Sequence, residues 1–170
     1  MRNKVFILAG FLLCAALHVS AQTTNYQAYS VFVYGLSKYT SWPSTGKTEF
    51  TITVIGRSKV YDEMVKAYAG KSINGIPMKV NQVDDLVASS EPQILYVSEG
   101  KSNSIEALMK QTAGKPVLII AEREGLHKKG ATMSFIAIDS KLRLDINGKE
   151  LQSRQIKISA QLQALTNETL

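Results

Sequence analysis

The sequence has one cysteine, Cys14, and two histidines, His18 and His127, among its 170 residues. A disulfide needs two cysteines, and thiol–imidazole metal sites or nucleophile–imidazole pairs need more of these residues than the chain offers. The three Gly-Lys-Ser/Thr triplets also lack the earlier glycine of a phosphate-binding loop. We therefore expect no catalytic residues, no metal site and no cofactor.

Long apolar runs are also absent, except over residues 5–17. Arg2 and Lys4 precede this run, and small residues that suit a signal peptidase follow it. The run is too short to cross a bilayer of ~30 Å, which needs ~20 apolar residues. We therefore expect residues 1–21 to be an export signal that is removed, with no membrane span after processing.

The domain expected after processing, residues 22–170, has no cysteine and keeps only His127 of the two histidines. Loss of Arg2 and Lys4 lowers the formal net charge from +6 to +4. The lysines are spread along the whole chain, so we interpret the positive charge as solvated surface and expect no binding to nucleic acid. With 45% hydrophobic and 20% charged residues in the whole sequence, the composition is that of one globular domain.

Strand and helix patterns alternate along this domain. Apolar spacing and turn residues predict, in order, a helix over residues 24–41, a strand over 50–55, a helix over 58–69, a strand over 78–83, at most a brief helix over 84–89, a strand over 94–97, a helix over 104–112, a strand over 117–120, a hairpin from 133–138 and 142–146, and a final amphipathic helix with Ile158, Leu162 and Leu165 on one face. Continuous apolar strands belong in a sheet that is covered on both sides. We expect a single α/β domain with a mixed, mostly parallel sheet, helices on both faces, and a C-terminal antiparallel hairpin plus helix.

One candidate ligand site lies in the turn Gly56-Arg57-Ser58, which follows the first expected strand. A helix N-terminus beside an arginine can hold an anion at the carboxyl end of a sheet. The same residues also suit an ordinary turn with a Ser cap. Both interpretations remain open.

His127 lies in a charged stretch, residues 122–129, between two expected strands. The chain has no Gly-x-Ser-x-Gly elbow whose serine would pair with this histidine as a nucleophile. We interpret the stretch as a solvated loop and assign His127 no role.

The first helix carries a second stripe, Val31 and Tyr34 with Lys38 beyond, roughly opposite its main apolar face. Two explanations are open. Either the helix is buried nearly all round, or the stripe contacts a partner, which is another copy of the chain or a receptor.

Several segments in this order resemble the YfiR-like family of bacterial periplasmic proteins, over residues 26–165. The segments are Tyr39-Thr40-Ser41-Trp42-Pro43, residues 50–56, residues 70–77, residues 130–138, residues 142–147 and residues 156–162. The Trp-Pro corner and the final strand-Asn-helix pattern are the more specific parts.

The resemblance implies a single α/β domain with a mixed sheet, a periplasmic location, often a homodimer, and no enzymatic activity. The best-known member restrains an inner-membrane diguanylate cyclase by binding its periplasmic part, which links envelope signals to cyclic-di-GMP and biofilm formation. Related domains accompany sensor kinases. We therefore expect a regulator that binds the periplasmic domain of an inner-membrane cyclase or kinase. The alternative is a periplasmic carrier of a small ligand. Cysteines present in some members are absent here, so we expect no disulfide.

Three residues of these family motifs have a structural explanation. Trp42 and Pro43 are expected to stop the first helix, with the indole ring anchored in the core. Asn147, after the last expected strand, is expected to cap the final helical region with its side chain.

Overall fold

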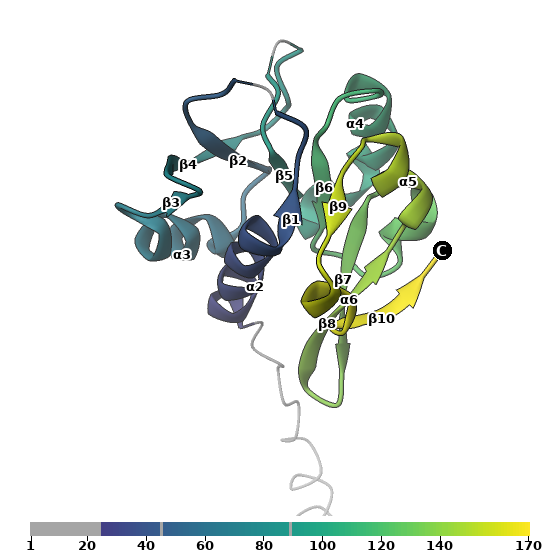
Figure 1. Ribbon diagram of the computed structural model, residues 1–170. Helices are drawn as coiled ribbons and strands as arrows, with labels where there is room; N and C mark the ends of the chain where they lie inside the picture. Colours follow the sequence, from purple (N-terminus) through teal and green to yellow (C-terminus); the bar gives the residue numbers. More distant parts are fainter. Residues whose placement is uncertain (1–24, 45, 89) are drawn as a thin grey trace, which may run out of the picture.

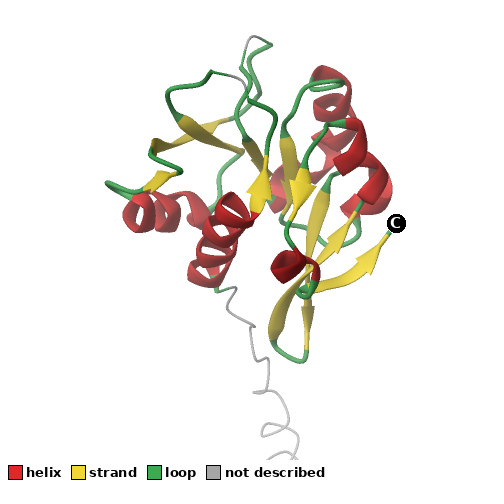
Figure 2. Ribbon diagram, viewed as in Figure 1, coloured by secondary structure: helices red, strands yellow, loops and turns green. Residues whose placement is uncertain are grey.

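The computed structural model describes residues 25–44, 46–88 and 90–170 (Figure 1). The expected export signal, residues 1–21, lies outside these ranges. Figure 2 distinguishes helices from strands along the same chain. The elements are α2 (Tyr26–Tyr39), β1 (Thr40–Ser41), β2 (Phe50–Ile55), α3 (Lys59–Tyr68), β3 (Ser72–Ile73), β4 (Ile76–Val83), β5 (Ile94–Val97), η2 (Glu99–Ser104), α4 (Ile105–Gln111), β6 (Leu118–Ala121), η3 (Leu126–Lys129), β7 (Met133–Ile138), β8 (Lys141–Ile146), α5 (Gly148–Ser153), β9 (Lys157–Ile158), α6 (Ala160–Gln163) and β10 (Thr166–Thr169).

Eight of these strands form one mixed sheet in the order β10-β8-β7-β6-β5-β2-β4-β3. The pairs β10–β8, β7–β6, β6–β5, β5–β2 and β2–β4 are parallel, whereas β8–β7 and β4–β3 are antiparallel. Strands β1 and β9 form a separate antiparallel pair. The predicted fold class is confirmed: a single α/β domain with a mostly parallel sheet, and the hairpin β7–β8 followed by α5.

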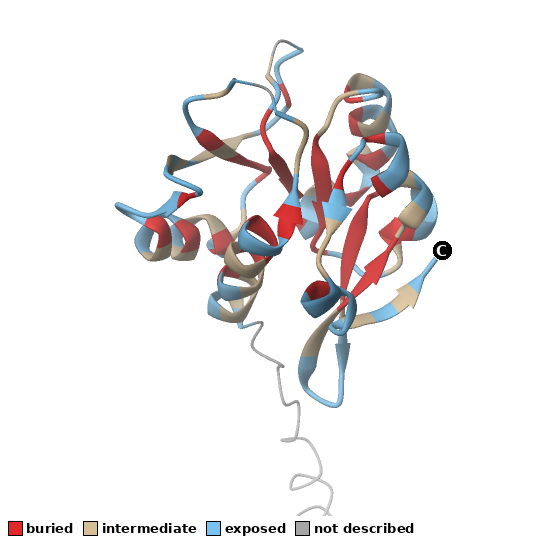
Figure 3. Ribbon diagram, in the orientation of Figure 1, coloured by how far each residue is buried: buried red, intermediate tan, exposed pale blue. Residues whose placement is uncertain are grey.

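The sheet has an apolar cluster on each face, as the continuous apolar strands predicted. In β5, Ile94 and Tyr96 belong to the cluster covered by α2 and α3, whereas Leu95 and Val97 belong to the cluster covered by α4 and η3. Figure 3 shows that the central strands are buried and that exposure is concentrated on the outer faces of the helices and in the loops. Helices therefore cover both faces of the sheet.

Local signals located several elements correctly. Ser58 caps α3, since its Oγ accepts a hydrogen bond from the Val60 amide at 3.3 Å. In the hairpin β7–β8, Asp139 and Ser140 have φ values of 48° and 60°. This is the left-handed pair of turn residues that matches the twist of two antiparallel strands.

The chain after the hairpin differs from the expected single amphipathic helix. It forms α5, β9, α6 and β10, and of the three expected apolar contacts only Leu162 is buried, while Ile158 is half-buried and Leu165 is exposed. Pairing of β9 with β1 and of β10 with β8 supplies backbone hydrogen bonds that a continuous helix would forgo. Tertiary pairing therefore overrides the helical spacing in this segment.

The segments on either side of β4 compare differently with the expectations. Residues 72–73 form β3, a strand that the sequence did not predict, and it pairs with the first residues of β4. Over residues 84–89, where at most a brief helix was expected, the described residues form turns and bends. No helix among the described residues is both long and apolar enough to cross a membrane.

Candidate functional site

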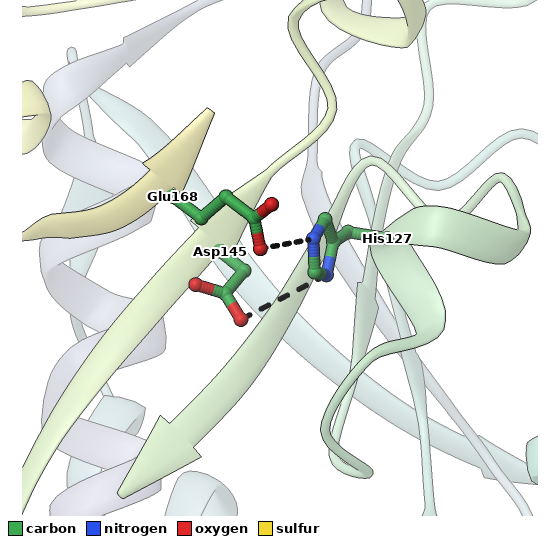
Figure 4. A group of neighbouring side chains, drawn as sticks. All are labelled: His127, Asp145 and Glu168. Carbon is green, nitrogen blue, oxygen red and sulfur yellow. Dashed lines mark ion pairs between the residues drawn. The ribbon is translucent and has the colours of Figure 1, made fainter. Parts of the chain in front are cut away.

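The polar cluster of His127, Asp145 and Glu168 lies where β10 runs beside β8 at the edge of the sheet (Figure 4). The residues come from η3, β8 and β10 respectively. One ligand-type atom of each residue lies within 4.8 Å of those of the other two. The fold thus brings an imidazole and two carboxylates together from three separate segments.

The η3 turn places His127 in the interior. It begins after Gly125 and ends before Gly130, whose φ values are 78° and 105°, a conformation that glycine adopts without strain. The Nδ2 of Asn147 donates a hydrogen bond to the His127 carbonyl at 3.0 Å. The histidine is 1% exposed as a result.

Strand pairing places the two carboxylates next to each other. Glu168 of β10 is the parallel register partner of Asp145 in β8. The side chain of Asn167 donates from its Nδ2 to Asp145 Oδ1 at 2.8 Å. Alternation along β8 predicts an outward-facing, half-exposed Asp145, but β10 and η3 cover it and it is buried.

The two nitrogens of the imidazole have different surroundings. Nδ1 of His127 lies 2.9 Å from Ser134 Oγ and 3.9 Å from Asp145 Oδ2. Nε2 lies 3.4 Å from Glu168 Oε2 and forms no hydrogen bond within the described part of the chain. Glu168 also forms an ion pair with Lys128, whose Nζ lies 2.9 Å from Glu168 Oε2, and this contact lowers the pKa of Glu168.

The Ser134–His127 contact resembles the pairing of a nucleophile with a base. Ser134 is completely buried, at 0% exposure, in the middle of the sheet. A substrate carbonyl has no path to its Oγ in this structure. The contact therefore orients the imidazole and does not form a hydrolytic site.

The charged stretch that contains His127 is not the solvated loop expected from the sequence. His127 and Glu122 are both buried, although the residues between them include exposed Arg123 and Glu124. Glu122 follows directly after β6, so its side chain lies at the carboxyl end of the sheet. The stretch therefore contains both buried and exposed polar side chains, and its composition alone did not show which are which.

The turn Gly56-Arg57-Ser58 lies at the carboxyl end of β2, with Gly56 buried and Arg57 exposed. The Glu122 carboxylate accepts hydrogen bonds there from Ser58 Oγ at 3.2 Å and from the Glu99 amide at 3.3 Å. Burial raises the pKa of Glu122. A carboxylate of the chain itself thus occupies the position beside the N-terminus of α3.

The second stripe of α2 is divided between surface and interior. Val31 is 64% exposed, and Lys38 is also exposed. Tyr34 is half-buried, with its ring centroid 5.7 Å from that of Tyr68 and 4.3 Å from Lys71 Nζ. Burial of the helix nearly all round is therefore wrong for this stripe, and its role as a contact surface is taken up below.

The Trp-Pro corner is half-buried. The Trp42 ring packs edge-on against Phe50 with centroids 5.2 Å apart, and Nε1 donates to the Gln93 carbonyl at 3.2 Å. Helix α2 ends before this corner, at Tyr39, because Thr40 already belongs to β1. Pro43 therefore follows the helix end at a distance of several residues and does not itself terminate it.

Asn147 and Arg154 hold α5 in place. Asn147 Oδ1 accepts from the Glu150 amide at 3.1 Å, which caps α5 as expected. Arg154, which the sequence did not single out, is buried and donates to the carbonyls of Thr112, Lys115 and Val117 at 3.0, 3.3 and 3.4 Å. Sequence patterns do not reveal this role, because the three acceptors are backbone atoms of a distant loop.

The chain is thus an α/β domain with a mixed, mostly parallel sheet, in which the Trp-Pro corner follows α2 and Asn147 caps α5. A family model matches residues 26–166, and the chain belongs to the YfiR/HmsC-like family. Membership indicates a regulatory protein of the periplasm. A search of curated proteins found no match to this chain.

Proposed function

We propose that the protein regulates an inner-membrane signalling enzyme, a diguanylate cyclase or a sensor kinase, by binding that enzyme's periplasmic domain. The family match over residues 26–166 carries this proposal, because it covers nearly all of the described chain. We further propose that residues 1–21 are an export signal, so that the mature chain begins at Gln22. Mass spectrometry of a periplasmic extract tests that start.

We propose that the α2 stripe of Val31, Tyr34 and Lys38 is the contact surface. Val31 is an exposed aliphatic side chain on a helix, and Tyr34 beside it is held by Tyr68 and Lys71. Ordered aromatic side chains next to apolar groups are typical of the centres of protein interfaces. The positive charges of Lys38 and Lys71 favour a partner surface with acidic groups.

Regulation of this kind is a shift between two states of the partner. Changing a two-state enzyme from 1:99 to 99:1 requires a preference of about 5.5 kcal/mol for one state. An interface of about 800 Å² per partner supplies binding energy on that scale. Contacts from scattered surface lysines do not, because exposed ion pairs contribute about 0–1 kcal/mol each.

A small-ligand carrier with its site at Gly56, Arg57 and Ser58 is the alternative. The Glu122 carboxylate beside Ser58 counts against an anionic ligand at this turn. A homodimer is the other use open to the α2 stripe, and in that case Val31→Glu weakens self-association. Sedimentation of the purified protein measures that separately.

The test is deletion of the gene followed by complementation. Deletion should change the cyclic-di-GMP level or the output of a linked kinase, and the wild-type gene should restore it. Val31→Glu should fail to restore it, whereas Val87→Glu, a matched valine that is 63% exposed away from α2, should restore it. Unchanged signalling on deletion, together with tight binding of a small metabolite by the purified protein, would favour the carrier.

A further inference from the structure

We propose that His127, Asp145 and Glu168 bind a divalent transition-metal ion of the Zn²⁺ type. One donor atom from each residue lies within 4.8 Å of the other two, and the set consists of one imidazole nitrogen and two carboxylate oxygens. Imidazole and carboxylate donors together suit Zn²⁺ and its first-row neighbours. The sequence did not indicate the site, because Glu168 was expected to follow a helix and not to lie in a strand beside Asp145.

The strongest observation is the position of His127 Nε2. This nitrogen is buried, forms no hydrogen bond within the described residues, and lies 3.4 Å from Glu168 Oε2. When Nδ1 carries the proton and donates it to Ser134 Oγ, Nε2 presents a lone pair to a carboxylate oxygen. Nε2 and Oε2 would then be two acceptors 3.4 Å apart, an arrangement that is unfavourable unless a cation lies between them.

The distances suit a metal ion as that cation. Two ligands of Zn²⁺ with bonds of 2.0–2.1 Å in a tetrahedral arrangement lie about 3.3 Å apart. The observed 3.4 Å between Nε2 and Oε2 is close to this value. One donor atom of Asp145 lies within 4.8 Å of those of the other two residues, and of its two oxygens Oδ1 accepts the hydrogen bond from Asn167.

The surrounding residues orient the three ligands. Ser134 fixes one nitrogen of the imidazole, and Asn167 fixes one oxygen of Asp145. Contacts of this type are usual around metal-binding histidines and carboxylates. Glu168 is partly exposed on the edge strand β10, and this leaves a route from solvent to the ligands.

Lys128 competes with the ion. Its Nζ lies 2.9 Å from Glu168 Oε2, and its side chain is more than half exposed. A flexible surface lysine can move away when a divalent ion binds the same oxygen. The competing possibility is a protonated imidazole between the two carboxylates with no metal, and the experiment separates the two.

The test is calorimetric titration of chelator-treated protein with ZnCl₂. The wild type should bind one ion per chain, and Glu168→Gln should weaken binding by at least about tenfold, since even the loss of an outer contact costs that much. The control is Glu49→Gln, which removes another carboxylate paired with a lysine, Lys79 at 3.2 Å, away from the cluster. It should leave the affinity within about twofold of the wild-type value.

Two further variants and a thermal scan complete the test. Ser134→Ala should weaken Zn²⁺ binding by roughly 10–100-fold through loss of imidazole orientation. Lys128→Ala should strengthen it by up to about fivefold, because the competing ion pair is gone. Zn²⁺ should raise the melting temperature of the wild type but not of Glu168→Gln. Absence of one-to-one binding, or equal binding by Glu168→Gln and Glu49→Gln, would overturn the proposal and leave the protonated imidazole.

Discussion

Glu168 Oε2 lies 3.4 Å from Nε2 of the buried His127. This contact joins strand β10 to η3, the turn that connects β6 and β7. Among the described strands, β10 forms the edge of the eight-stranded sheet and pairs with β8. Its side-chain contacts with β8 and η3 add to the few backbone hydrogen bonds of a four-residue strand. The cluster therefore contributes to holding this edge in place.

Asn167→Ala tests that contribution. The change removes the 2.8 Å hydrogen bond to Asp145 Oδ1 and leaves an oxygen of a buried carboxylate without this donor. We expect the free energy of unfolding to fall by roughly 1–3 kcal/mol. Denaturant unfolding measures it, and a change below about 0.5 kcal/mol would show that the edge does not depend on this bond.

Arg154→Met tests the attachment of α5. Removal of the guanidinium leaves the carbonyls of Thr112, Lys115 and Val117 without their buried donor and Glu150 without its partner. We expect a loss of roughly 3–5 kcal/mol.

The control for this variant is Lys149→Met, an exposed change on the same helix, which should stay within about 0.5 kcal/mol of the wild type. Equal effects of the two substitutions would contradict a structural role for the buried arginine.

Elements whose signals are local were predictable from the sequence. Strand β2 was predicted with its observed bounds. Its run of apolar and β-branched residues indicates a strand, and Gly56 directly after it indicates a turn. The Ser58 and Asn147 caps were also predictable, since each side chain bonds to an amide two or three residues ahead. The family resemblance was carried by such local motifs, and the family model confirmed it.

The polar cluster was not predictable in the same way. Its formation depends on β10 lying parallel to β8, a pairing between residues far apart in the chain. The segment's apolar spacing indicated a helix, and a helix would not set Glu168 beside Asp145. His127 likewise resembled a surface residue because its neighbours are charged, while the positive φ of Gly125 and Gly130 turns it inward.

Trp42 offers a graded test of the Trp-Pro corner. Trp42→Phe keeps an aromatic ring against Phe50 but loses the hydrogen bond to the Gln93 carbonyl, so we expect a loss of about 1 kcal/mol. Trp42→Ala also loses the packing, and because the ring is half-buried we expect roughly 2 kcal/mol, less than for a fully buried tryptophan. Equal stability of the two variants in chemical denaturation would contradict the packing role.

Glu122 predicts a particular pH dependence of stability. Burial raises its pKa in the folded chain, so the folded state holds the proton more tightly than the unfolded state does. Its contribution to stability is therefore fully present below the unfolded pKa and is lost as pH rises through the folded pKa. In Glu122→Gln this loss is absent, so the stability of the variant relative to wild type should increase as the pH rises above about 4.

Unfolding curves at several pH values provide the measurement for Glu122. Asp62→Asn, a change of an exposed carboxylate on α3, serves as the control and should show a much flatter difference. If the variant instead lost stability relative to wild type as the pH rises, the prediction that burial raises the pKa of Glu122 would be contradicted.

The most direct test of the regulatory account is the affinity between the purified protein and the periplasmic domain of the enzyme whose output changes on gene deletion. The account predicts saturable one-to-one binding of chains. Val31→Glu should weaken it by at least about tenfold, through a charge placed in the centre of the contact, and Val87→Glu by less than about twofold. Absence of binding by the folded wild-type protein, or equal weakening by both variants, would contradict the account.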